Sequence, residues 1–356
     1  MDYLSLELNL AQLHRSIQKT KTNKYSDIRK ESYQTTLLEL YEKLSNEDFS
    51  TMSLLEIIDR KKIIDFTFQS IQYLDNSTLT ITPFEIIFCL EKILSFWIPQ
   101  HNYIIVTSLD NNLNSYEINY SLTLKEPIHQ LIEDRYGITF GFRLIQIRMP
   151  RYYVHDYFAN VALYHELGHF VDSKYEVSKK YVISSHIYDQ TISPEANGAK
   201  MTKRYYHCME HFADIFASQY IGDSICLSLN YVSHNHSSSE THPATAIRIT
   251  KVEAFLSGVT TDQLVTDILA QTKILCSHDL EIRFKDLPLD DFDNLIPMEI
   301  DTDVDLHSVI LAGWKFWRRR PNSLIEKLGK NIVYKIINNL IEKSISNYII
   351  KQNWNN

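Results

Sequence analysis

The sequence predicts an α+β fold that is mostly α-helical, with a small sheet in its middle part. Glycine and proline are scarce, at 8 and 9 of 356 residues, which is less than half of their usual share of roughly 12%. So few helix breakers favour long helices over a turn-rich β sandwich. Apolar residues recur at helical spacing before residue 100, and short alternating segments follow it. We therefore expect an N-terminal helical region at 1–100, a central domain at 101–285, and an acidic linker with a C-terminal helical region at 286–356.

The composition narrows the class of protein. Hydrophobic residues make up 44% of the chain and the net charge is −8, which argues against a nucleic-acid partner. No apolar run reaches the roughly 18 residues of a membrane helix, and the first residues show no signal-peptide pattern. The four cysteines form no CxxC pair, which is typical of buried thiols in a reducing compartment; they are Cys89, Cys208, Cys226 and Cys276. We therefore expect a cytoplasmic protein without a membrane span.

Residues 1–100 are expected to form several helices. One helix start is clearly marked, because Thr82 is a good N-cap, Pro83 suits the first helical position and Glu85 stands three residues after the cap. That helix should end before Pro99. The apolar faces expected of the preceding helices are Leu4, Leu8, Leu10, Leu13 and Ile17; Tyr33, Leu37, Leu40, Tyr41 and Leu44; and Leu54, Ile57, Ile58, Ile63, Ile64 and Phe68.

Strands and helices are both expected in the central region. Alternating or β-branched residues predict strands at 103–107, 116–120 and 142–148. A short helix at 127–136, ended by Gly137, separates the second strand from the third. Further helices are expected from about 156 past 172, over about 203–221, and from Pro243 to near Gly258.

The C-terminal region begins with an acid-rich segment, 286–305, which indicates a linker or surface loop. Helices are expected from Leu306 onward, with a break at Pro321. Residues 314–320 mix aromatic and basic side chains, a composition that could contact nucleic acid or an anionic membrane. We instead expect the aromatic rings to pack and the arginines to pair with the acidic segment.

The chemistry is concentrated in the sequence His165-Glu166-Leu167-Gly168-His169. Two histidines four residues apart on a helix point to one side, so both imidazoles can reach one ion. Glu166 projects near the same ion and is positioned to take a proton from a water molecule that the ion activates. The motif therefore predicts a metal centre with Glu166 as its general base, although two helix histidines with a solvated glutamate remain an alternative.

A second helix offers the third ligand. Catalytic zinc commonly has two histidines and one glutamate as ligands, with one position open. Glu210 follows His169 by 41 residues, and Asp214 lies one turn further along the same expected helix. We expect Glu210 to bind the metal and Asp214 to accept a hydrogen bond from the outer nitrogen of a ligand histidine. His207 or His211 on this helix is the alternative third ligand.

A third element carries His242 and Arg248 around a helix start. Either side chain could donate a hydrogen bond to the oxyanion that forms when water attacks a carbonyl. The other interpretation is that His242 caps the helix before Pro243 and that Arg248 pairs with a carboxylate.

Together these segments resemble the gluzincin metallopeptidases, and within them the HtpX and prenyl-protein protease group. The resemblance covers about residues 140–258 and rests on three segments: 165–169, 210–214 and 242–249. It implies a zincin-like domain with a small sheet before the HExxH helix, whose edge strand, expected at 142–148, binds the substrate backbone. The residue roles that it implies are zinc binding by His165, His169 and Glu210, general base catalysis by Glu166, support of a ligand by Asp214, and contact with the substrate or the oxyanion by His242 and Arg248.

The sequence also departs from that group. HtpX-type proteins usually have membrane helices, which are not expected here, and the 41-residue gap between His169 and Glu210 is short for them. The soluble ImmA/IrrE-type peptidases, which have HExxH and a glutamate helix, are a second resemblance, but they do not require the segment at 242–249.

The expected function is therefore that of a soluble zinc-dependent peptidase acting on a protein or peptide substrate. The alternative is a zinc-organised binding or regulatory protein that holds a partner in its cleft without cleaving it. The intact Glu166 favours the enzyme, because a purely structural site does not need that base. A regulatory protein partner that restrains or activates the peptidase is also expected.

Overall fold

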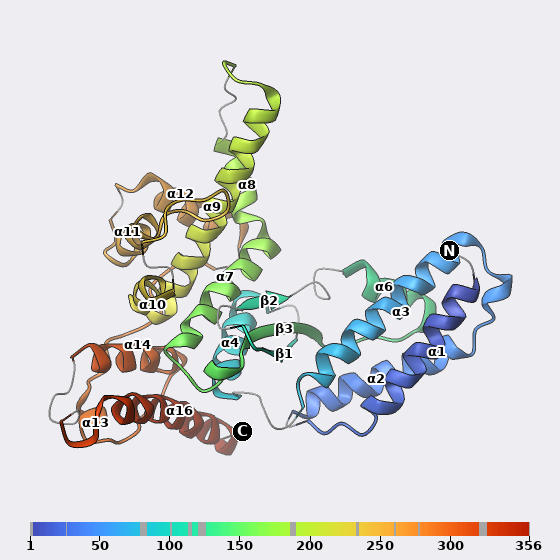
Figure 1. Ribbon diagram of the computed structural model, residues 1–356, viewed down its shortest axis with the longest axis horizontal. Helices are drawn as coiled ribbons and strands as arrows, with labels where there is room; N and C mark the ends of the chain where they lie inside the picture. The colour runs from blue at the N-terminus through green and yellow to red at the C-terminus, as the bar shows by residue number, and fades with distance from the viewer. Residues whose placement is uncertain are drawn as a thin grey trace. The chain divides into compact units, whose positions relative to one another are not determined.

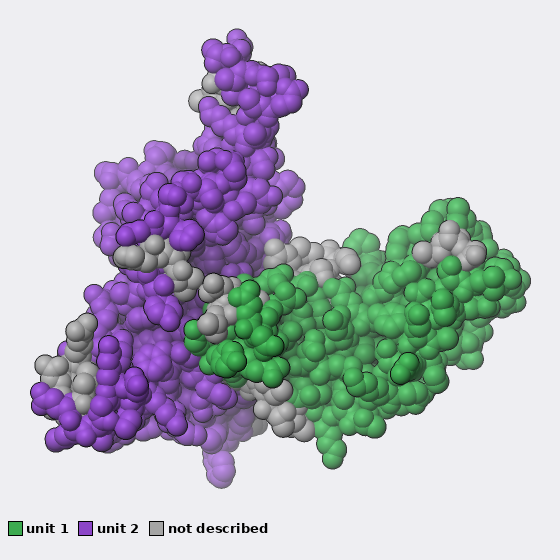
Figure 2. Space-filling model, in the orientation of Figure 1, with its two compact units in different colours: residues 1–83, 94–154 green, residues 84–93, 155–356 purple. Residues whose placement is uncertain are grey.

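Helices dominate the computed structural model (Figure 1), which confirms a mostly helical α+β fold. The structure describes residues 3–25, 27–78, 84–99, 102–112, 116–119, 126–185, 190–232, 235–259, 261–276, 278–319 and 326–355. The chain forms two compact units (Figure 2). Unit 1 contains residues 1–83 and 94–154, and unit 2 contains residues 84–93 and 155–356. The division after residue 154 falls inside the region that we expected to be a single domain, 101–285.

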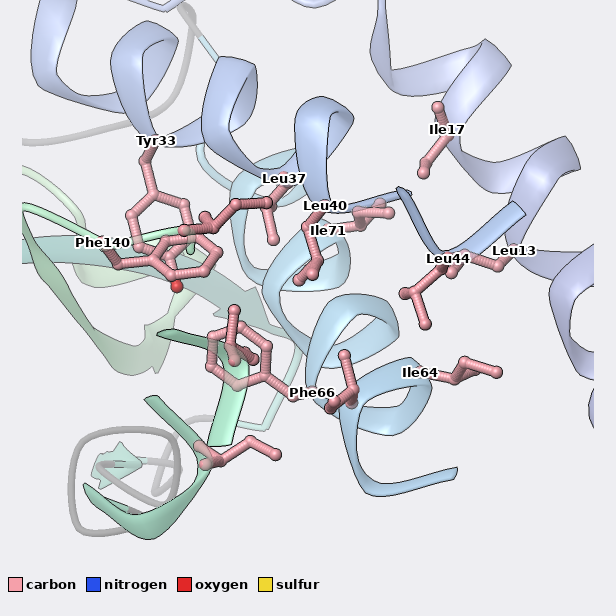
Figure 3. Close-up of a cluster of buried hydrophobic side chains, with 14 of the residues drawn as sticks. Leu13, Ile17, Tyr33, Leu37, Leu40, Leu44, Ile64, Phe66, Ile71 and Phe140 are labelled. Atoms are coloured by element: carbon pink, nitrogen blue, oxygen red, sulfur yellow. The ribbon is translucent and has the colours of Figure 1, made fainter. Parts of the chain in front are cut away.

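Unit 1 is built on a helical core. Helices α1 (Tyr3–Thr20) and α2 (Ile28–Ser45) pack against α3 (Leu54–Asp75), and a short 3-10 helix, η1 (Phe49–Thr51), precedes α3. The start of α3 is fixed by a capping box, in which Ser53 and Glu56 bind each other's backbone N–H. Figure 3 shows the buried side chains between these helices and the sheet, among them Leu13, Leu37, Ile64, Phe66 and Phe140.

The predicted apolar face of α1 is partly wrong. Leu13 and Ile17 are buried as expected, but Leu4 and Leu8 are 57% and 60% exposed, and Leu6 is buried instead. The reason is that α1 packs through the stripe formed by Leu6, Leu13 and Ile17, which is a different side of the same helix.

The strands that the structure describes form one sheet in unit 1. Strand β1 (Tyr103–Asp110) runs parallel to β3 (Arg143–Pro150), and β2 (Glu117–Asn119) pairs antiparallel with the other side of β3. The strand order is therefore β1-β3-β2. The expectation that the strand at 142–148 is a free edge is wrong, because β3 is central and its backbone pairs on both sides. It has no free edge along 146–148 for a substrate to extend.

Two further helices of the first half agree with the sequence. Helix α6 (Glu126–Tyr136) ends at Gly137, whose positive φ of 63° suits a residue without a Cβ. Helix α4 (Phe84–Trp97) ends before Pro99. The predicted cap residues of α4, Thr82 and Pro83, lie outside the described residues.

Unit 2 holds the motif helices. Helix α9 is longer than expected, because it begins at Pro194 rather than near 203. Its start has a readable signal in Ser193, which caps the helix, and in Pro194 at the first helical position. The remaining elements after the sheet are η2 (Arg151–Tyr153), η3 (Ala159–Val161), α7 (Ala162–Tyr175), α8 (Val177–Ser185), α9 (Pro194–Ile221), α10 (Ser224–Val232), α11 (Thr245–Leu256), α12 (Gln263–Leu275), α13 (Asp290–Asp293), α14 (Asp303–Arg319) and α16 (Lys330–Asn355).

The acid-rich segment 286–305 is packed onto unit 2 rather than extended as a linker. Phe292, Met298 and Ile300 are buried, and the backbone N–H of Met298 donates to the hydroxyl of Ser344. The expected charge pairing is confirmed, since Lys315 pairs with Asp286 and Arg319 with Asp293. Pro321, the expected break before α16, lies outside the described residues.

No helix in the described part of the chain is both long and apolar enough to cross a membrane. The four cysteines are free.

Candidate metal centre

The centre is built where α7 crosses α9, two helices in close contact within unit 2 (Figure 1). Gly168 and Ala213 meet at the crossing. A Cβ at position 168 would lie 2.8 Å from the Cα of Ala213 and 3.1 Å from its carbonyl oxygen. A side chain at position 168 would therefore force the helices apart. Our sequence analysis gave Gly168 no role, although two small residues on facing helices are a recognisable signal of close approach.

This crossing brings the three expected ligands together. The Nε2 atom of His165 lies 3.5 Å from one carboxylate oxygen of Glu210, and the Nε2 atom of His169 lies 3.4 Å from the other. The two imidazole rings are nearly perpendicular, with centroids 4.6 Å apart. His165 is 9% exposed and Glu210 is buried, whereas His169 is half-buried.

The separations suit a small cation. Ligands bound to zinc at about 2.1 Å in a tetrahedron stand about 3.4 Å from one another, and the ligand atoms of His165, His169 and Glu210 all lie within 4.8 Å of one another. Burial favours the neutral form of Glu210, but the two histidines and Arg248 outweigh burial and hold the pKa of its carboxyl well below the usual value. The group therefore offers two imidazole nitrogens and an ionised carboxylate, which are ligands that zinc accepts.

Asp214 supports the first histidine from behind. Its carboxylate is fully buried and lies 2.9 Å from Nδ1 of His165. Burial lowers the pKa of His165, but Asp214 and Glu210 outweigh that effect and raise it to about 10. A cation at Nε2 competes with a proton for that nitrogen, while a proton on Nδ1 can stay directed at Asp214. This is the orientation that fixes a ligand histidine.

Arg248 is held inside the centre. It is 7% exposed, and its Nε and Nη2 each donate to Asp214 at 2.7 Å. The same Nη2 lies 3.1 Å from Glu210. Burial lowers the pKa of Arg248, but Asp214, Glu210 and Glu166 outweigh burial and raise it above its usual value. The structure thus gives Arg248 the carboxylate pairing that the sequence left as its second interpretation.

His242 lies at the exposed rim of the centre. Its side chain is 59% exposed, and Nε2 lies 3.5 Å from Glu210. Its other ring nitrogen is 2.8 Å from the hydroxyl of Thr241. Of the expected substrate-facing pair, the structure therefore leaves His242 accessible and buries Arg248.

Glu166 and the two alternative ligands occupy different surroundings. Glu166 is half-buried on α7, between the two histidines, and its charge acts on Arg248. His207 binds the carbonyl oxygen of Ser239 at 2.9 Å. His211 is buried, and burial lowers its pKa to about 4. Among the described residues, the group that could hold a metal is His165, His169 and Glu210, without either alternative.

When the chain is compared with known proteins, no family model, no curated protein and no solved structure matches it. The resemblance to gluzincin peptidases therefore rests on the motif residues of this sequence.

Proposed function

We propose that this protein is a zinc-dependent peptidase of the gluzincin type. The observation that carries the proposal is the convergence of His165 Nε2 and His169 Nε2 on the carboxylate of Glu210, with Asp214 behind His165. His₂Glu sets of this kind are typical of catalytic zinc. A zinc ion bound there polarises a carbonyl group and makes water a better nucleophile at neutral pH.

The protein's own groups have separate tasks in this mechanism. Glu166 takes a proton from the attacking water and passes it to the nitrogen of the leaving amine, so the peptide bond breaks to a carboxylate and an amine. Asp214 orients His165, and Arg248 keeps Asp214 and Glu210 ionised. His242, which is exposed beside Glu210, donates a hydrogen bond to the oxyanion as water attacks the carbonyl.

The number of ligands favours an enzyme over a zinc-organised binding protein. Structural zinc sites usually have four protein ligands, whereas catalytic sites have three and leave a position for water or substrate. The group found among the described residues has three, and exposed His242 stands beside it without belonging to it.

The test compares zinc-loaded wild type with Glu166→Gln on a mixture of peptides from a digested proteome, and new N-termini are identified by mass spectrometry. General base catalysis contributes about 10²–10⁴-fold, so we expect cleavage to fall by that factor while bound zinc stays equal. Glu195→Gln, on an exposed turn of α9, is the matched control and should cleave as wild type does. Wild-type cleavage by Glu166→Gln would remove Glu166 from its role. No cleavage by a fully zinc-loaded wild type would favour the binding protein.

A further inference from the structure

A stripe of polar side chains on α9 holds the segment 235–248 turn by turn. The stripe contains Lys203, His207, Glu210 and Asp214, which are spaced by one helical turn each. Glu210 and Asp214 belong to the metal centre described above. The two earlier members, Lys203 and His207, extend the stripe away from the metal and toward the exposed loop that carries His242. The partners of the stripe, in the same order, are Glu240, Ser239, His242 and Arg248.

His207 makes the stronger of the two outer contacts. Its Nε2 lies 2.9 Å from the carbonyl oxygen of Ser239. A carbonyl oxygen only accepts, so Nε2 of His207 must carry a proton and donate it. Lys203 reaches Glu240 at 3.2 Å, but Glu240 is 81% exposed, and exposed ion pairs of this kind contribute little.

Ser239 connects this contact to His242. The N–H of Ser239 donates to the carbonyl oxygen of His242 at 2.8 Å, and the N–H of His242 donates to the hydroxyl of Ser239 at 2.9 Å. These reciprocal bonds close a tight turn over 239–242. Fixing Ser239 on α9 therefore fixes the backbone from which the imidazole of His242 reaches Glu210.

We propose that His207 is a positioning residue, which acts through Ser239 to hold the imidazole of His242 beside the metal centre. The position of His242 is a property of the loop and does not depend on the proposed peptidase function; only the kinetic consequence rests on that function. His207 thus has a task that explains its place on the ligand face of α9 without ligating the metal.

The first experiment is independent of activity. Ring nitrogen and proton NMR signals of the histidines are compared in zinc-loaded wild type, His207→Ala, His207→Gln and His236→Ala. His236 is an exposed histidine of the same loop, and it provides the matched control. We expect the ring signals of His242 to shift in His207→Ala and to return toward wild type in His207→Gln, because a glutamine amide can also donate to Ser239. Signals of His242 that stay in place in His207→Ala, or that move equally in His236→Ala, would overturn the proposal.

The second experiment uses cleavage of a peptide found with wild type. A misplaced catalytic group can cost about 10²-fold in rate, so His207→Ala should lower kcat by about tenfold or more with little change in KM. The same substitution made in His242→Ala should have no further effect, because His207 acts through His242. An equal loss in both backgrounds would show a general structural role and contradict the proposal. If wild type has no activity, the proposed function fails while the NMR result still decides the role of His207.

Discussion

At the residue scale, the metal centre depends on a buried cluster of alternating charge. Asp214 is fully buried between Arg248 and His165. Burial raises the pKa of Asp214, but Arg248 and His165 outweigh burial and lower it to about 2. A buried carboxylate of this kind stays ionised only while its partners remain, because an isolated buried charge costs several kcal/mol. Asp214 therefore stabilises the local structure and orients the ligand His165.

We predict that Asp214→Asn weakens zinc binding by about 10- to 100-fold, because substitutions behind a ligand histidine typically have that effect. The free energy of unfolding should also fall, by about 3 kcal/mol, since Arg248 loses its bidentate partner. Chelator competition measures the zinc affinity and urea denaturation the stability. Asp223→Asn, which removes an exposed partner of Arg318, should leave the zinc affinity unchanged. Equal affinities in the wild type and Asp214→Asn would show that Asp214 does not support the ligand.

At the element scale, the distance between α7 and α9 decides whether the ligands can meet. The two histidines are on α7 and Glu210 is on α9, so the separation of the helix axes sets the distance between their ligand atoms. Gly168 allows the close approach, because even one Cβ would collide with the backbone of Ala213. The glycine inside the HExxH motif is therefore a packing requirement of this centre.

We expect Gly168→Ala to move α7 away from α9 and to weaken zinc binding, with a loss of about 1–3 kcal/mol in the free energy of unfolding from overpacking. The matched control is Gly198→Ala on the exposed first part of α9, where an added Cβ meets no atom within 4 Å. This control should stabilise the protein by up to about 1 kcal/mol, since alanine is the better helix former. The checks are isothermal titration with zinc and thermal unfolding. If Gly168→Ala binds zinc as tightly as Gly198→Ala, the close approach is not needed.

At the scale of the whole molecule, buried histidines tie the stability of unit 2 to pH. His307 on α14 is buried, and its Nδ1 lies 3.1 Å from the hydroxyl of Tyr164, the neighbour of a metal ligand. Burial lowers the pKa of His307 to about 4, with Asp303 acting in the opposite direction. The unfolded chain binds a proton at His307 below a pH of about 6.5, whereas the folded chain does so only near pH 4. Stability is therefore fully present above pH 6.5 and decreases as the pH falls toward 4.

We predict that this one group removes about 2–3 kcal/mol of the free energy of unfolding between pH 7.5 and 4.5. His307→Gln, which keeps a hydrogen-bonding partner for Tyr164, should lose that much less stability over the same interval. Urea denaturation at the two pH values measures the difference. His236→Gln, at an exposed loop position, should follow the wild type. A wild type and a His307→Gln variant with the same pH dependence would show that His307 is not held neutral by burial.

Local features of the sequence determined the helices and the members of the candidate centre. The HExxH spacing puts His165 and His169 on one side of a helix, and the spacing of Glu210 and Asp214 does the same on the second helix, because the helical period is a property of adjacent turns. The same logic predicted the end of α6 at Gly137 and the strands of the sheet. The early start of α9 was missed, although Ser193 and Pro194 mark it.

Tertiary structure alone decided which of these elements meet. The strand at 142–148 is central rather than an edge because β1 and β2 both pair with it, and strand pairing is a contact between distant segments. The exposure of Leu4 and Leu8 depends on which side of α1 packs. Arg248 became an inner support and His207 a contact of the loop because each bonds to a partner more than thirty positions away in the chain. Periodicity specifies the face of a helix, whereas the partner of that face is chosen by packing across the whole chain.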